Sequence, residues 1–160
     1  MSHYEERLER DLTGIREHVA HMAEQVETAV KNAMHALQTG NDKLAAATVI
    51  ADHPINRSMR QIDEMCHKFI ALHLPSASHL RLLSSVIRVN IELERIGDYA
   101  ATIAREALQL PEPPSGSMAR ELERVGNEAQ LMLRQAVRSF KELNADLAKG
   151  TMIMEEQMEN

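Results

Sequence analysis

Residues 8–37, LERDLTGIREHVAHMAEQVETAVKNAMHAL, decide the fold class of this protein. Their apolar side chains recur at alternating steps of four and three, which is the spacing of the buried face of a helix in a bundle. These positions are Leu8, Leu12, Ile15, Val19, Met22, Val26, Ala29, Ala33 and Leu37. Gly40 and Asn41 follow and end the pattern. The stretch therefore predicts one helix of about 35 residues, or roughly 50 Å at 1.5 Å per residue.

Two more long helices are predicted after it. The second runs from Asp42, a plausible N-cap, to Pro75, with a kink expected at Pro54 because proline removes a backbone hydrogen bond. The third carries two adjacent apolar stripes between residues 82 and 110, which indicates a helix covered on a wide face. The sequence thus predicts an all-α, up-down bundle of long antiparallel helices.

A break in this pattern divides the chain. Residues 110–117 read LPEPPSGS, which cannot continue a helix. We therefore expect a three-helix unit at 1–110, a linker at 111–117 and a further unit at 118–160. A fourth helix is predicted after the linker, and the acidic tail 149–160 is expected either to continue it or to fray. The fourth helix has its apolar positions at Leu122, Val125, Ala129, Met132, Ala136 and Phe140.

A weak internal repeat links the fourth helix to the first. Sliding the chain by 103 positions matches Val19 with Leu122, and Asn41 with Asn144. Heptad spacing alone explains matches within the helices, but the shared asparagine lies beyond them. The chain is therefore interpreted as one three-helix unit followed by the opening of a second.

Composition narrows the class of protein further. The chain is 44% hydrophobic but only 2% aromatic, so the core must be aliphatic, with methionines filling gaps. The formal net charge is −6 with Lys and Arg dispersed, which argues against nucleic-acid binding. The single cysteine, Cys66, excludes an internal disulfide and is expected to be buried. The absence of a signal-like or membrane-spanning apolar run predicts a cytoplasmic protein that is not embedded in a membrane.

The densest group of chemically useful residues lies in the third helix. Glu94 and Asp98 are four residues apart, so both carboxylates emerge on one helix face. Oxygen-rich pairs of this kind suit hard cations or iron when a facing helix adds further acids. Asp52 and Asp63 on the second helix are the candidates to complete such a site, with a divalent, iron or zinc ion as its cofactor. The alternative is an ordinary acidic face paired with nearby arginines.

Catalytic patterns are not evident. The eight histidines form no compact ligand pattern, and there is no phosphate loop, nucleophile elbow or dinucleotide motif. We therefore expect a non-enzymatic protein.

The run ERIGDYA at residues 94–100, followed by Ile103-Ala104, resembles the signature helix of the PhoU phosphate-transport regulators. Leu80-Arg81 before this helix and the break after Leu110 also fit, and the resemblance covers essentially the whole chain. It implies a duplicated three-helix bundle that binds metal clusters through an acidic motif in each repeat. Glu94 and Asp98 occupy the motif of the first repeat.

The resemblance also implies partners and a role. It implies a cytoplasmic, often dimeric protein that contacts the phosphate-specific ABC transporter and its sensor histidine kinase, with negative regulation of the phosphate-starvation response. The motif surface expected to meet a partner comprises Glu94, Arg95, Gly97, Asp98 and Tyr99.

The chain departs from the family pattern at two levels. The second repeat is short, so its acidic motif is missing, and we expect a homodimer to which the fourth helices contribute. In addition, Asn56, Met59 and Gln61 stand where the family tends to have acids, while Thr102 and Arg105 replace its usual Asn and Glu. These changes weaken a metal site. The alternatives to phosphate regulation are a metal-carboxylate bundle protein and a helical assembly module without a ligand.

Overall fold

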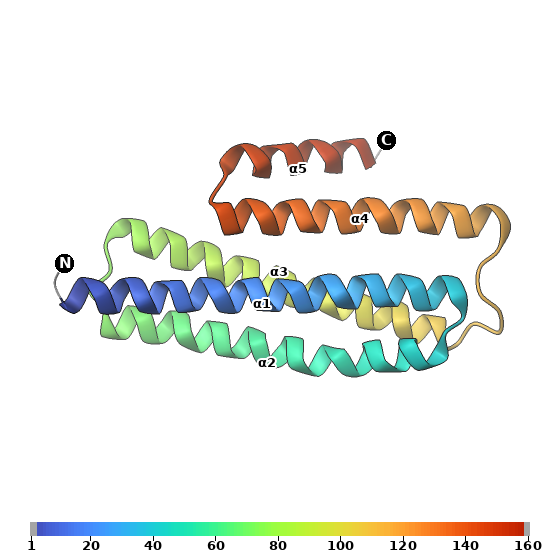
Figure 1. Ribbon diagram of the computed structural model, residues 1–160, viewed down its shortest axis with the longest axis horizontal. Helices are drawn as coiled ribbons and strands as arrows, with labels where there is room; N and C mark the ends of the chain where they lie inside the picture. The colour runs from blue at the N-terminus through green and yellow to red at the C-terminus, as the bar shows by residue number, and fades with distance from the viewer. Residues whose placement is uncertain (1–2, 159–160) are drawn as a thin grey trace.

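A computed structural model describes residues 3–158 and is helical throughout, with no strand in that range. The first three helices pair with one another as a bundle, whereas the last two form a hairpin that rests on the first helix alone (Figure 1). The bundle consists of α1 (His3–Thr39), α2 (Asp42–Leu72) and α3 (Ala77–Ala107), and the hairpin of α4 (Gly116–Glu142) and α5 (Ala145–Met158).

The core lies between α1, α2 and α3, as the periodic pattern predicts. Apolar positions of α1 from Leu8 to Ala33 are buried along its length, and Ile55, Ile62 and Leu83 meet them from the other two helices. Cys66 is also completely buried, and burial raises the pKa of its thiol to about 11. It therefore acts as a small apolar core residue, as the sequence indicates.

Side-chain caps fix the N-termini of α2 and α3. The Asn41 side chain accepts a hydrogen bond of 3.0 Å from the backbone N–H of Leu44, so Asn41 is the N-cap of α2 and the prediction of Asp42 was wrong by one residue. Ser76 caps α3 in the same way. Pro54 lies inside α2, which remains one helix through it, as expected.

The predicted apolar positions of α4 are only partly covered within this chain. The buried residues of α4 are Gly126, Val137 and Ser139, whereas the predicted seam positions Val125, Ala129 and Ala136 are exposed. The reason is that α4 packs on α1 through a neighbouring face. Gly126 allows this approach, because a Cβ there would lie only 2.6 Å from the Met34 Cε atom.

Over the described residues, the tail neither continues α4 nor frays. It forms a separate helix, α5. The chain reverses at Leu143, whose φ of 50° ends α4 in the left-handed region. The Asn144 side chain then accepts hydrogen bonds from the N–H groups of Asp146 and Leu147, at 3.0 and 3.1 Å, and starts α5. The short α5 is methionine-rich and has no marked apolar periodicity, so the sequence pattern alone could not separate it from a continuation of α4.

This reversal repeats the α1–α2 turn 103 residues later. Gly40, with a φ of 65°, corresponds to Leu143, and the capping Asn41 corresponds to Asn144. One turn further on, the Thr48 hydroxyl donates to the Leu44 carbonyl at 2.8 Å, and the Thr151 hydroxyl donates to the Leu147 carbonyl at 3.1 Å. The weak sequence repeat is therefore a repeat of local structure.

Within residues 3–158, no helix combines the length and apolar character that a transmembrane segment requires.

Candidate functional site

Three of the four predicted acidic residues come together where α2 and α3 pack closely. Gly97 makes this contact possible, since a Cβ at its position would lie 3.1 Å from the Ile55 Cγ2 atom. The close approach brings Asp52 on α2 beside Glu94 and Asp98 on α3, near enough for their charges to influence one another. We call Asp52, Glu94 and Asp98 the acidic group.

Burial and mutual repulsion define the electrostatics of the acidic group. Burial raises the pKa of Asp52, and the neighbouring Asp98 raises it further, while Arg105 acts in the opposite direction. Burial likewise raises the pKa of Glu94, followed by the charges of Asp98 and Asp52. At neutral pH, the negative charge of the acidic group therefore destabilises the folded state.

One oxygen of the acidic group has no partner. The Asn56 side chain donates a hydrogen bond of 2.8 Å to Asp52 Oδ2, but Asp52 Oδ1 is buried without a donor. A buried acceptor of this kind is uncommon. Carboxylate oxygens under mutual repulsion are chemically suited to a hard cation. As placed, however, the His, Cys, Asp and Glu side chains of the described residues include no set of three arranged to hold a metal ion.

Asp63, the fourth predicted acid, is not part of this group. It lies 11 residues after Asp52, or about 16 Å further along α2 at 1.5 Å per residue. There its carboxylate is 3.4 Å from the His67 ring nitrogen, in a half-exposed pair on the same helix. Spacing alone could not distinguish it from Asp52, because both sit on the same helix and neither has a distinctive neighbour in sequence.

Only part of the predicted partner-binding surface is exposed to solvent. Arg95, Asp98 and Tyr99 are exposed on α3, with 60% of Tyr99 open to solvent, and Glu94 is half-buried. Gly97 is buried against Ile55, so it cannot contact a partner, and its place in the predicted surface was wrong. Its role is to let α2 and α3 approach, because glycine has no Cβ to fill the space that Ile55 occupies.

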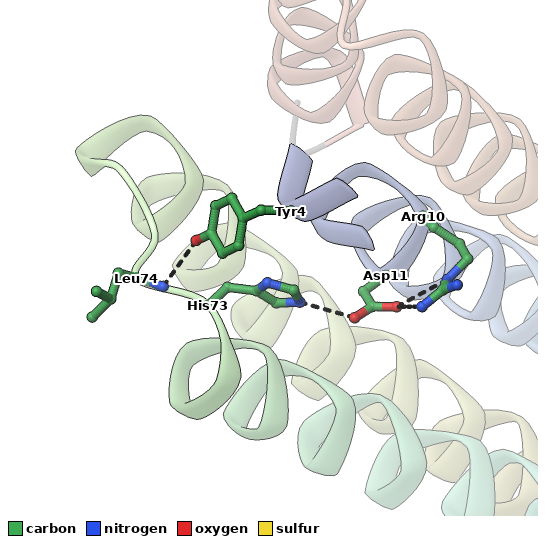
Figure 2. A network of polar contacts seen from close by, with 5 residues as sticks. All are labelled: Tyr4, Arg10, Asp11, His73 and Leu74. Carbon is green, nitrogen blue, oxygen red and sulfur yellow. Dashed lines mark hydrogen bonds and ion pairs between the residues drawn. The ribbon is translucent and has the colours of Figure 1, made fainter. Parts of the chain in front are cut away.

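A second polar arrangement, which the sequence did not reveal, lies at the other end of the bundle (Figure 2). His73 is buried at the end of α2, and its Nε2 atom lies 2.9 Å from Asp11 Oδ2 on α1. Since an ionised carboxylate can only accept, Nε2 carries the proton and donates. The Tyr4 hydroxyl accepts a hydrogen bond of 3.2 Å from the Leu74 N–H, and the Tyr4 ring packs edge-on against His73.

These contacts tie the start of α1 to the turn between α2 and α3, and we call Tyr4, Asp11 and His73 the terminal anchor. The hydrogen bond from His73 lowers the pKa of Asp11, with the nearby Arg10 contributing in the same direction. Asp11 and His73 are 62 residues apart. Nothing in the local sequence of either residue indicates the other, so only the bundle geometry reveals the pair.

With this geometry in place, comparison with known families is informative. The model of the PhoU domain matches residues 19–107, more than half of the chain. The chain belongs to the PhoU family. The matched range contains the whole acidic group, whereas Tyr4 and Asp11 of the terminal anchor and the α4–α5 hairpin lie outside it.

PhoU proteins of several bacteria are similar to the chain over most of its length. It is 37% identical over 149 residues to the phosphate-specific transport system accessory protein PhoU homolog of Pseudomonas aeruginosa, covering 91% of this chain and 61% of that protein. It is 33% identical over 138 residues to the PhoU protein of Escherichia coli, covering 86% of this chain and 57% of that protein. The chain thus spans about 60% of the length of these PhoU relatives.

The fold agrees with a solved PhoU structure. The crystal structure of PhoU from Pseudomonas aeruginosa superposes with a TM-score of 0.84 at 37% sequence identity, covering 89% of this chain and 68% of that one. The all-α bundle predicted from the sequence is therefore confirmed, and so is the PhoU resemblance.

Proposed function

We propose that this PhoU-family chain is a cytoplasmic, non-enzymatic regulator that represses phosphate uptake and the phosphate-starvation response when phosphate is plentiful. The observation that carries this proposal is the similarity, over 91% of the chain, to a protein named as an accessory of phosphate-specific transport. The proposed action is contact with the phosphate ABC transporter and its sensor histidine kinase.

The exposed part of the motif on α3 supports a contact role. Tyr99 presents a large aromatic side chain to solvent beside the exposed Asp98, and Arg95 lies one turn away in an ion pair of 3.3 Å with Glu92. Aromatic and arginine side chains dominate the binding energy of many protein interfaces. We propose that Arg95, Asp98 and Tyr99 form the partner-binding surface, with Gly97 beneath it fixing the position of α3.

The test is alkaline phosphatase activity in phosphate-replete cells with and without this gene. High activity on deletion, restored to low activity by the wild-type gene, supports repression, and unchanged activity contradicts it. A second arm uses Tyr99→Ala, which we expect to fail in complementation and in pull-down of the transporter ATPase or kinase. Leu74→Ala is the matched control, because Leu74 is also exposed but lies at the far end of the bundle.

A cation at the acidic group is a second candidate function, favoured by the unpartnered Asp52 Oδ1 atom and by the raised pKa values of Asp52 and Glu94. Asp52, Glu94 and Asp98 would supply its oxygen ligands, and the ion would neutralise their repulsion. Calorimetric titration of the metal-free protein with Mn²⁺, Fe²⁺ or Zn²⁺ measures this directly. Stoichiometric binding lost in Asp52→Asn but kept in Asp63→Asn supports the site, whereas equal loss in both or no binding argues against it.

A further inference from the structure

An apolar hollow lies between α1, α3 and α4. It is present because α4 packs on α1 and not on α3, so the space beside α3 is not filled by the hairpin. The hollow has a volume of about 270 Å³, and almost all of its lining is apolar. The small side chains of Ala20 and Ala23 form part of its wall on α1 and leave this room. The other apolar residues that line it are Val19, Val89, Leu93, Ile96, Leu133, Ala136, Val137 and Phe140.

The hollow is elongated along the helices. Its lining extends from Val89 to Ile96 on α3 and from Leu133 to Phe140 on α4, seven residues on each helix, or about 10 Å. Helix α3 runs in the same direction as α1, and α4 runs in the opposite direction (Figure 1). Val89 and Phe140 therefore lie towards one end of the hollow, and Ile96 and Leu133 towards the other.

One end of the hollow carries an unbalanced positive charge. The charged residues that line the hollow are Arg88, Glu92 and Lys141. Glu92 lies 3.3 Å from Arg95, and Lys141 lies 3.4 Å from Glu24, so both already have a partner. Arg88 is exposed beside Val89, and within residues 3–158 it has no hydrogen bond or ion pair. Arg88 can therefore accept an anionic group from outside the chain.

We propose that this hollow binds a free fatty acid, with the hydrocarbon chain along the apolar lining and the carboxylate paired with Arg88. The lining offers almost no polar atom to a peptide or a sugar, whose polar groups would lose their hydrogen bonds there, whereas a hydrocarbon chain needs none. The single unpaired guanidinium matches the single charge and the two oxygens of a carboxylate. This proposal goes beyond the proposed role in phosphate regulation and does not depend on it.

The first experiment titrates the full chain with octanoate, nonanoate and decanoate in a calorimeter, below the concentration at which each forms micelles. We expect saturable binding of one molecule per chain, with an affinity that rises about two- to fourfold for each added CH₂ group. No saturable binding, or an affinity that does not depend on chain length, overturns the proposal.

The second experiment tests the role of Arg88. Arg88→Gln should weaken decanoate binding about tenfold or more and leave the binding of the uncharged decanol unchanged. Arg120→Gln is the matched control, because Arg120 is exposed at the start of α4 and does not line the hollow. Equal weakening of decanoate binding in both variants overturns the pairing with Arg88.

The third experiment locates the hydrocarbon chain. Ala20→Leu fills part of the hollow and should weaken decanoate binding about tenfold, while helical content and thermal unfolding show that the fold is kept. Ala46→Leu, at an exposed position of α2, should bind as the wild type does. A folded Ala20→Leu variant with wild-type affinity overturns the placement.

A final arm separates a free fatty acid from a lipid surface. Vesicles of phosphatidylglycerol should leave the protein in the supernatant on sedimentation. Binding to these vesicles without binding of free decanoate would assign Arg88 and the hollow to a membrane surface and overturn the proposal.

Discussion

At the residue scale, the acidic group shows how a site can oppose stability. Asp52 and Glu94 both have raised pKa values, with burial as the first cause and neighbouring carboxylates as the second. A raised carboxyl pKa means that the folded state favours the protonated form. The cost of ionisation is therefore present at neutral pH and is relieved as the pH falls through the raised pKa.

We predict that Asp52→Asn stabilises the protein at neutral pH by up to about 1 kcal/mol, because it removes the half-buried charge while keeping an oxygen for the Asn56 side chain. Thermal unfolding measured from pH 7 to pH 4 should show the advantage of the variant shrinking as the wild-type carboxylate becomes protonated. Asp63→Asn, whose pair with His67 is more exposed, is the control and should change little. A variant less stable than the wild type at pH 7 would contradict this account.

The terminal anchor has the opposite dependence on pH. The hydrogen bond from His73 lowers the pKa of Asp11, so ionised Asp11 favours the folded state. This contribution is fully present above the ordinary Asp pKa of about 3.9 and disappears as the pH falls through the lowered value.

Asp11→Ala should therefore cost about 1 kcal/mol at pH 7, a figure kept small because the Asp11 side chain is 39% exposed to solvent. Chemical denaturation at pH 7 and near pH 2.5 measures the effect, and the two proteins should converge at the acidic end. Glu9→Ala, an exposed acid close by on α1, controls for loss of charge alone. A difference that stays constant down to low pH would indicate that Asp11 acts through packing instead.

At the scale of elements, the α1–α2 and α4–α5 connections have the same backbone conformation and capping but different residues at the left-handed position. Gly40 takes a φ of 65° at the first turn, whereas Leu143 takes a φ of 50° at the second. Glycine adopts this region without steric cost, and a leucine does not. The asparagine caps that follow both turns show that the second turn keeps its hydrogen bonds despite the strained residue.

Leu143→Gly should stabilise the α4–α5 turn by about 1 kcal/mol, because it relieves a left-handed conformation at an exposed position. Amide hydrogen exchange across α5 measures the effect locally, and slower exchange is expected. Gly40→Leu should act in the reverse direction on the α1–α2 turn, where an added Cβ would also lie 3.4 Å from the Pro113 Cδ atom. Faster exchange of α5 in Leu143→Gly would mean that the leucine side chain itself supports the turn.

The apolar faces of α1 and α4 show what the sequence could predict about packing and what it could not. The seam of α1 is buried as predicted, because α2 and α3 cover the face that its heptad spacing marks. The equally regular spacing in α4 marks Val125, Ala129 and Ala136, and these are exposed. Periodicity shows that a helix has an apolar face, but it does not show whether a neighbour within the chain lies against it.

At the scale of the whole molecule, the distribution of contacts predicts uneven stability. Helices α1, α2 and α3 each contact the other two, α4 rests on α1, and α5 packs on α4 alone. Regions with few buried apolar contacts open at lower free energy than the core.

We therefore predict that amides in the middle of α1, α2 and α3 exchange by global unfolding, while those of α5 exchange at least tenfold faster, equivalent to a difference of about 1.4 kcal/mol. The comparison should be made at low protein concentration, since self-association would protect the hairpin by mass action. Uniform protection across all five helices in the monomer would contradict this division.

The sequence by itself determined the first four helices, their apolar faces, the break after Leu110, the PhoU resemblance and the presence of Glu94 and Asp98 on one face. These follow from local spacing and from residue chemistry, which act along a single helix. Only the tertiary structure decided that Asp52 joins the acidic group while Asp63 does not, that Gly97 is buried, and that His73 meets Asp11. The physical reason is that these outcomes depend on the rotation and depth of one helix against another, which packing of the whole bundle sets.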